Sequence, residues 1–320
     1  MLSRRGLLQG AAALATIPLG SRAFANAGPT TLVVGFPPGG GPDTIARVIA
    51  DQVRTQGTSM LVDNKVGAGG RIALEHVKRA APDGRTLCLT PGAMLNIYPH
   101  VYSKLSYSKD DFTPIANVAA YSLALVVPVE SGHKTLQDLL EWCRKNPGGA
   151  TYATPGLGND TNILGWQMSK LAGIQMQPIP YQGGPQLTQA VLGRQVTCAI
   201  NITSNFSELH RSGKVRILAL SSSRRSARLP DVPTFGELGM SECQTEEWLG
   251  VVGPRGLSSD QVKSIATLIL AAARDPAVQK TIVDRDHIPM PEDAQQFARS
   301  LEETYERRGK QVAAAGFKLE

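Results

Sequence analysis

Three loops rich in glycine and proline each follow an apolar, strand-like run, and their composition suits the binding of an anion. They read PPGGGPD at 37–43, TPGAM at 90–94 and TPGLGND at 154–160. A helix is expected after the first and the third, so backbone N–H groups and the positive end of each helix can face one ligand. A single loop of this kind is explained equally well as a tight turn between a strand and a helix. Three of them, all placed after strands, favour a binding site.

Signatures of covalent catalysis are missing from the sequence. Neither glycine loop ends in the lysine and the serine or threonine of a P-loop, and no GxGxxG, GxSxG or HExxH motif occurs. The five histidines are not spaced with one another, or with cysteines or acids, as zinc ligands are; they are His76, His100, His133, His210 and His287. We therefore expect a protein that is not an enzyme and that needs neither a metal nor a cofactor.

The first 25 residues have the three-part layout of an export signal. MLSRRGLLQGAAALATIPLGSRAFA begins with Arg4 and Arg5, continues with a mildly apolar stretch, and ends in small residues around Phe24. The paired arginines resemble a twin-arginine signal. The mature protein is therefore expected to begin near Asn26 and to work in the periplasm, after removal of residues 1–25. A nucleotide has no place there, so a carboxylate is the anion that we expect in the glycine loops.

Charge and cysteine content limit the classes of partner. The formal net charge is +6, and loss of the export signal, with three arginines and no acid, leaves +3. This excess can attract anionic solutes, but no basic run is interleaved with aromatic residues, so nucleic acid is not expected.

Export allows disulfides, yet Cys88 and Cys198 lie in apolar runs typical of buried thiols. The pairing of Cys88, Cys143, Cys198 and Cys243 therefore stays open.

Beyond the signal, predicted strands and helices alternate in two successive units, which is typical of a parallel, doubly wound sheet covered by helices. The first unit has strands at 30–36, 59–64 and 85–92 and helices at 44–53 and 73–81. The second has strands at 150–154, 174–181, 195–202 and 215–222 and helices at 135–149, 161–173 and 186–193. From Ser258 onward the chain is predicted to be mostly helical. Because ligands of open α/β sheets bind beyond the carboxyl ends of the strands, two such units can close on an anion from both sides.

Several motifs, in order along the chain, resemble those of the Bug-type receptors, the extracytoplasmic solute receptors of tripartite tricarboxylate transporters. They are VVGFPPGGGPDTIAR, NKVGAGGRIA, APDGRTL, YATPGLGN, IPYQGG and LPDVPTFGELG. Each is weakly specific alone, whereas the ordered set, from about Thr31 to the C-terminus, is highly specific. The resemblance implies an α/β, type II periplasmic-binding-protein fold with two doubly wound lobes around a ligand cleft. It implies residues 26–124 and 249–320 for the first lobe and 125–248 for the second.

The resemblance also implies which residues hold the ligand. In this family, backbone groups of two glycine loops hold one carboxylate, largely through ordered waters. In the first lobe the implied contacts are Pro38, Gly39, Gly40, Gly92 and Ala93, with Asp43 as the cap of the first helix. In the second lobe they are Thr154, Gly156, Gly158, Asn159, Tyr181, Gly183 and Gly184. Trp248, where the chain is expected to cross back to the first lobe, is interpreted equally well as lining of the cleft or as packing.

Two departures from the family pattern bear on the ligand. Asn162 stands where members often carry histidine, and Asn201 stands where they often carry aspartate. Asn201 can hydrogen-bond to a ligand but adds no charge for an ammonium group. This weakens the case for an amino acid and leaves dicarboxylates, hydroxy acids and aromatic acids.

The function implied is that of a receptor, expected to be a monomer, that captures a small organic carboxylate and delivers it to the membrane subunits of a transporter. Two alternatives stay open. A receptor that presents its ligand to a sensor kinase needs the same two-lobed fold. A secreted hydrolase would need a nucleophile, a base and an orienting group, and no such set is recognisable in the sequence.

Overall fold

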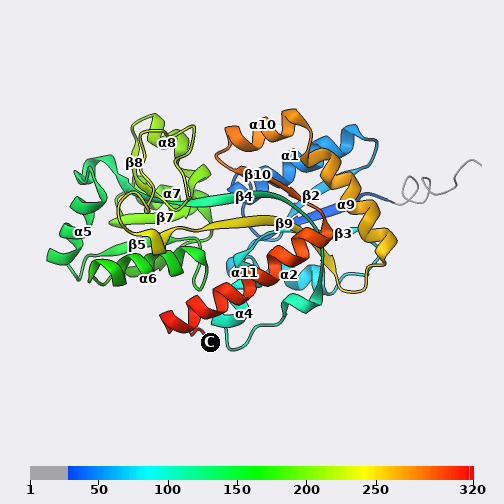
Figure 1. The fold of residues 1–320 in the computed structure, drawn as a ribbon, viewed down its shortest axis with the longest axis horizontal. Coiled ribbons are helices and arrows are strands. Elements are labelled where there is room, and N and C mark those ends of the chain that lie inside the picture. Colours follow the sequence, from blue (N-terminus) through cyan, green and yellow to red (C-terminus); the bar gives the residue numbers. More distant parts are fainter. Residues whose placement is uncertain (1–27, 317) are drawn as a thin grey trace, which may run out of the picture.

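The computed structural model of the protein describes residues 28–316 and 318–320, so the export signal predicted at residues 1–25 lies outside it. Two α/β lobes lie side by side and are joined by two long antiparallel strands, β4 (Phe112–Pro128) and β9 (Glu246–Pro254) (Figure 1). β4 pairs with β9 as far as Ser122 and with β7 from Leu123 onward. The chain thus passes between the lobes at these two residues of β4.

The first lobe is built on a central strand, β1, with parallel neighbours on both sides, β2 and β3. β9 continues the sheet beyond β3 in the antiparallel direction. α1 covers this sheet because its apolar residues recur at helical spacing and are buried together, as in Ile45, Ile49 and Val53. The elements are β1 (Thr30–Val34), α1 (Gly41–Thr55), β2 (Met60–Asn64), α2 (Arg71–Lys78), β3 (Thr86–Pro91), α3 (Ala93–Asn96) and α4 (Tyr98–Val101).

The second lobe repeats this plan on the other half of β4. β5 pairs in parallel with β6 and β7, and β4 pairs antiparallel with both β7 and β8. α5 starts at a capping box in which Thr135 and Asp138 each bind the other's backbone N–H. The elements are α5 (Leu136–Lys145), β5 (Thr151–Thr154), α6 (Asp160–Ala172), β6 (Gln177–Pro180), α7 (Gly184–Leu192), β7 (Cys198–Ile202), α8 (Ser207–Arg211) and β8 (Val215–Leu220).

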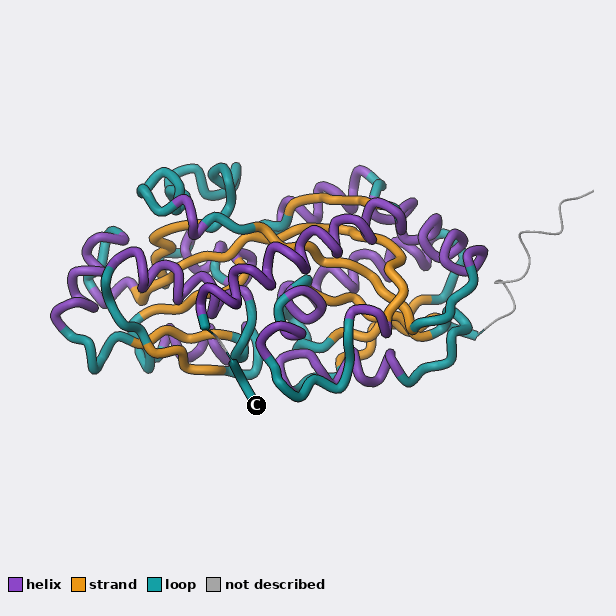
Figure 2. The backbone as a smooth tube through the Cα atoms, turned by 60° about the horizontal axis from the view of Figure 1, so that its bottom comes forward, coloured by secondary structure: helices purple, strands orange, loops and turns teal. Residues whose placement is uncertain are grey.

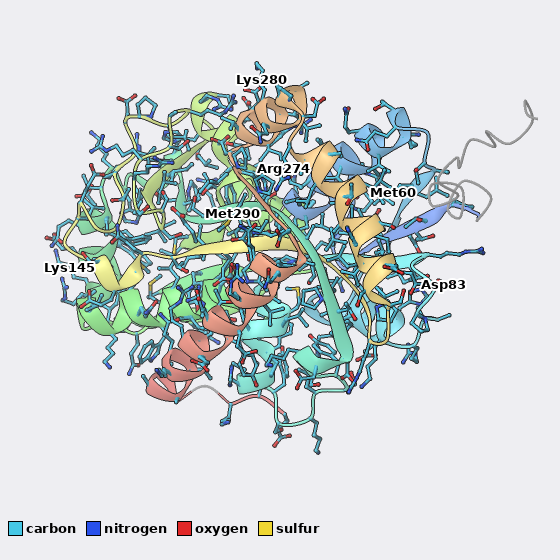
Figure 3. The ribbon with its side chains drawn as sticks, turned by 45° about the vertical axis from the view of Figure 1, so that its right-hand side comes forward. Met60, Asp83, Lys145, Arg274, Lys280 and Met290 are labelled. Atoms are coloured by element: carbon cyan, nitrogen blue, oxygen red, sulfur yellow. The ribbon has the colours of Figure 1, made fainter. Side chains whose placement is uncertain are left out.

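The C-terminal segment returns to the first lobe and then reaches back across the gap between the lobes. α9 (Ser259–Ala273) and α10 (Pro276–Asp284) pack on α1, and β10 (Ile288–Glu292) pairs with β4. α11 (Ala294–Ala315) packs against α3 and α4 of the first lobe and also against α6 of the second. Helices cover the strands on both sides in the view of Figure 2. Figure 3 shows Met290 of β10 near the middle of the molecule and Lys145 of α5 at the left-hand end of the second lobe.

The predicted parallel strands are present in each lobe, as β2, β1 and β3 and as β6, β5 and β7, whereas β4, β9 and β10 run antiparallel to their neighbours. The helical prediction beyond Ser258 missed β10. Its sequence, IPMPE, carries two prolines, which strands tolerate at an edge, and in the described residues β10 pairs only with β4. α3, α4 and α8 are four or five residues long, too short to show a periodic pattern.

The four thiols left open by the sequence, Cys88, Cys143, Cys198 and Cys243, are all free and buried. Burial raises the pKa of the Cys88 thiol to about 12, so it stays protonated and packs as a small apolar side chain. Among the residues that the structure describes, no helix has the length and apolarity needed to cross a membrane.

Candidate ligand-binding site

A small cavity lies between the lobes, where the carboxyl ends of β1, β3, β5 and β7 meet. Its volume is about 30 Å³, enough for about two water molecules. Its apolar lining consists of Phe36, Pro42, Pro91, Met94, Pro155 and Ile202. Its polar lining consists of Gly40, Gly41, Tyr121, Asn159, Asp160, Thr161, Gly184, Asn201 and Asn205.

The lobes touch around this cavity, so the structure is a closed form. The Tyr102 hydroxyl of the first lobe donates to the Leu157 carbonyl of the second, at 2.9 Å. Arg228 of the second lobe lies 3.4 Å from both Asp284 and Asp286 of the first. A ligand larger than two waters therefore needs the lobes to separate before it enters, and to close around it less tightly than in this structure.

The N-terminus of α1 opens onto the cavity. Gly40 occupies the N-cap position, and no side chain of the described residues caps the helix. Gly41 and Pro42 form its first turn and line the cavity. Pro42 has no N–H, and the Gly40 N–H donates to the Pro37 carbonyl at 3.2 Å, so Gly41 and Asp43 supply the uncapped N–H groups. At the positive end of a 15-residue helix, these groups make a site for a carboxylate.

The prediction that Asp43 caps this helix is wrong, because Asp43 is the third helical residue. Its buried carboxylate accepts hydrogen bonds from the Gly39 N–H at 2.9 Å, Arg47 Nε at 3.0 Å and Asn64 Nδ2 at 2.8 Å. Burial raises the pKa of Asp43, but the hydrogen bonds from Arg47, Gly39 and Asn64 outweigh it and leave the pKa below its usual value. Asp43 therefore fixes the shape of the glycine loop and does not line the cavity.

The N-terminus of α6, on the facing side of the cavity, is already occupied by the protein's own groups. The Asn159 side chain caps the helix and accepts from the Thr161 N–H at 3.1 Å and the Asn162 N–H at 3.4 Å. Asp160, the first helical residue, accepts from the Tyr121 hydroxyl at 2.8 Å and from the Thr161 N–H at 3.0 Å. The second lobe thus presents a carboxylate to the cavity where the first presents free N–H groups.

Asp160 is a buried acid in an unfavourable electrostatic position. Burial, followed by the charge of Glu247, raises the pKa of Asp160 to about 6, although hydrogen bonding by Tyr121 and the charge of Arg308 oppose the rise. Glu247 is itself paired with Arg308, whose Nε donates to Glu247 Oε1 at 2.7 Å. Asn96 donates to the second oxygen of Glu247 at 2.9 Å.

Asn201 places an unused hydrogen-bond donor in the cavity wall. Its Oδ1 accepts from the Ile202 N–H at 2.8 Å. Its Nδ2 is buried without a partner among the described residues. An unpaired buried donor costs free energy, so a ligand acceptor placed there would be favourable.

Four of the residues predicted from the sequence line the cavity: Gly40, Asn159, Gly184 and Asn201. Several others lie at the contact between the lobes. A methyl group added at Gly158 would lie 2.8 Å from Val101, and one added at Gly183 would lie 2.8 Å from Pro37, both across the gap. A methyl group at Gly156 would lie 3.6 Å from Gly69 of the first lobe.

The remaining predicted residues lie behind or beside the cavity. Thr154 is buried and donates to the Gly156 carbonyl at 2.8 Å, which holds the second loop. Tyr181 is not part of the lining; its N–H donates to the Thr154 carbonyl at 2.8 Å. Four further predicted residues are not part of the lining: Pro38, Gly39, Gly92 and Ala93. Their contact with a ligand stays a prediction.

Trp248 packs away from the cavity. Its indole N–H donates to Thr304 Oγ1 at 3.2 Å, and its ring meets Phe297 edge to face with centroids 4.9 Å apart. Both partners belong to α11, so the structure places Trp248 in the packing of that helix.

Sequence reasoning missed Gly41, Tyr121 and Asp160. Asp160 follows the predicted contact Asn159, and an acid directly after a helix cap usually serves the helix dipole, which concealed its position in the cavity. Tyr121 lies in the apolar run AAYSLALVV, where an aromatic residue is normally core. Only the crossing of β4 between the lobes brings it to the cavity.

A family model described as the receptor of the tripartite tricarboxylate transporter family matches residues 45–317. The chain is also 32% identical over 312 residues to a protein of Cupriavidus necator called "UPF0065 protein in gbd 5'region". That match covers 96% of this chain and 94% of the relative. The family resemblance seen in the sequence is thereby confirmed.

Two solved structures share the fold over most of their length. MatC from Rhodopseudomonas palustris, solved with bound malate, has a TM-score of 0.83 and 27% identity, over 89% of this chain and 98% of that one. An R. palustris protein solved with adipate has a TM-score of 0.87 and 26% identity, over 91% of this chain and 98% of that one. The predicted fold, two α/β lobes of the periplasmic binding protein type, is confirmed.

Proposed function

The chain belongs to the tripartite tricarboxylate transporter receptor family, and on that premise we propose that it captures a small organic carboxylate between its lobes and delivers it to the membrane subunits of a transporter. Binding takes place in the periplasm, and the protein makes and breaks no covalent bond.

One observation carries this proposal: the uncapped N-terminus of α1 opens onto a cavity closed by both lobes. The site offers a carboxylate fixed N–H donors and the positive end of a helix. Because a ligand there touches both lobes only when they are closed, its binding favours the closed form. The membrane subunits can then distinguish the loaded receptor by its shape.

Two structural neighbours support the choice of ligand class. MatC was solved with malate and the other R. palustris protein with adipate, both small organic acids. In this chain the ligand carboxylate would bind near Gly40 and Gly41, and the Asn201 amide would donate to a second polar group of the ligand. The glycines at the lobe contact would let the two loops approach closely.

A thermal-shift screen of the purified protein tests the proposal. The panel contains dicarboxylates, hydroxy acids, aromatic acids and amino acids, each beside its primary amide. A ligand at a hundred times its Kd adds about 2.7 kcal/mol to the free energy of unfolding. We expect at least one acid to raise the Tm by several degrees and its amide to leave the Tm unchanged.

A pair of variants ties this shift to the cavity. Pro42→Glu places an acid in the first turn of α1, where it occupies the N–H groups and repels a ligand carboxylate. Ala277→Glu places the same acid at the second residue of α10, an exposed position that is not part of the cavity lining. The acid-induced shift should vanish in Pro42→Glu and persist in Ala277→Glu. An equal shift in both variants would place the ligand elsewhere.

A further inference from the structure

The two helix N-termini that face the cavity differ in electrostatic sign. α1 presents backbone N–H groups that no side chain within residues 28–316 or 318–320 caps. α6 presents the carboxylate of Asp160, and its own N–H groups are bound by Asn159 and Asp160. A ligand that bridges the lobes therefore meets a positive end on one side and an acid on the other.

Asp160 has no cation of its own among the described residues. The nearest buried cation, Arg308, is bound to Glu247 through Nε and Nη2, and its Nη1 donates to Gln311 at 2.6 Å. Asp160 instead accepts from neutral donors, Tyr121 and Thr161. The residues found to line the cavity include no lysine, arginine or histidine. The positive charge that would balance Asp160 is thus missing from this lining.

We propose that this cation comes from the ligand: the cleft takes a zwitterionic acid, whose carboxylate binds at the N-terminus of α1 and whose ammonium group binds Asp160. The inference rests on the proposed function, which supplies the carboxylate end. It reverses the sequence-based expectation drawn from Asn201, because the acid that an ammonium group requires lies at Asp160, in the lining of the same cavity.

The physical reason is the cost of burying charge. An ionised carboxylate buried in a closed cavity without a cation is unfavourable, and an ammonium group beside it removes most of that cost. A second carboxylate at the same place would add repulsion instead. Burial, followed by the charge of Glu247, raises the pKa of Asp160 to about 6, so its ionised form is unfavourable in the unliganded protein. The Asn201 Nδ2 then binds a carbonyl or hydroxyl oxygen elsewhere on the ligand.

Binding of the ammonium group should also depend on pH. The groups that act on Asp160 are Tyr121 on β4, Thr161 on α6, Glu247 on β9 and Arg308 on α11. Burial holds the pKa of Tyr121 well above its usual value, and, against the opposing effect of burial, the charge of Glu247 raises the pKa of Arg308, so Asp160, with a pKa of about 6, is the group that titrates near pH 6. Affinity for a zwitterion should rise about tenfold per pH unit up to about pH 6 and then level off.

Calorimetric titration with matched probes tests the inference on the whole protein. The pairs are L-aspartate with L-malate, L-alanine with L-lactate, and 6-aminohexanoate with adipate, each of which exchanges an ammonium group for a hydroxyl or a carboxylate. Each probe is titrated into the unchanged protein, into Asp160→Asn, and into Asp260→Asn. Asp260 is a matched control because it also lies in the first turn of a helix, α9, but is exposed.

We expect an amino member of a pair to bind at least about tenfold more tightly than its partner, and Asp160→Asn to remove that preference. Asp260→Asn should keep it. If malate, lactate or adipate binds as tightly as its amino counterpart and Asp160→Asn changes neither, the inference is wrong while the proposed function stands. If no acid binds to the folded protein at all, both are overturned.

Discussion

Replacing Asp160 by asparagine should stabilise the unliganded protein, and only at neutral and alkaline pH. The pKa of Asp160 is about 6 in the folded protein, against 3.8 in an unperturbed chain. The folded state therefore holds its proton to higher pH than the unfolded state does. Stability is lost as the pH rises from about 4 to 6, and the full penalty is present above about pH 6.

The size of this penalty follows from the shift. About two pKa units, at about 1.36 kcal/mol each, amount to roughly 3 kcal/mol. Asparagine has no charge to bury and keeps a carbonyl oxygen for the Tyr121 hydroxyl, while the Thr161 N–H keeps its bond to Asn159. For a chain of this size, about 3 kcal/mol corresponds to a rise in Tm of about 6 °C.

Differential scanning calorimetry at about pH 8 and about pH 3.5 measures the effect. At the higher pH, Asp160→Asn should melt about 6 °C above the unchanged protein, and at the lower pH the two should melt together. The exposed control Asp260→Asn should show no such pH-dependent gain. A variant that melts below the unchanged protein at the higher pH would refute the reasoning, because the carboxylate would then stabilise the fold.

Three further substitutions probe the surroundings of the cleft. Arg308→Met should lower the free energy of unfolding in urea by about 3–5 kcal/mol, because it leaves Glu247 buried and unpaired. Adding Glu247→Leu should recover most of this loss, and equal stability of the single and double variants would contradict the expectation. Gly250→Ala should cost about 1–3 kcal/mol, because the methyl group overlaps the Phe297 ring, and Phe297→Leu should relieve it. Arg228→Ala should weaken acid binding about two- to fivefold in calorimetry, because the contacts of Arg228 with Asp284 and Asp286 join the closed lobes. An unchanged Kd would show that Arg228 does not stabilise the closed form.

Much of the fold follows from local sequence pattern. α1 and α6 begin directly after the two glycine loops, and β1, β3, β5 and β7 are short apolar runs bounded by turn residues. The periodicity of the sequence could not show whether a strand runs parallel or antiparallel to its neighbours. β4 and β9 are as apolar as the parallel strands, and only their pairing across both lobes shows that they run antiparallel.

Part of the site could also be predicted from the sequence. The glycine loops could be located because loops that follow parallel strands meet at one edge of a sheet. The resemblance to the receptor family then pointed to Gly40, Asn159, Gly184 and Asn201, which line the cavity. The role of Asp43 could not be predicted from the sequence, because it depends on tertiary contacts. Asn64, 21 residues away, and Arg47 both donate hydrogen bonds to the Asp43 carboxylate, which therefore does not face the ligand. The sequence could not show that Asp160 lacks a cation as partner. This follows only from the structure, in which Arg308 is bound to Glu247 instead.

The central claim is that an organic acid binds between the lobes through its carboxylate. Calorimetric titration of the acid that gives the largest thermal shift, beside its primary amide, tests this most directly. We expect one acid bound per protein molecule and no measurable binding of the amide, because the N-terminus of α1 attracts a negative charge. Binding of the amide with the same Kd as the acid would contradict it.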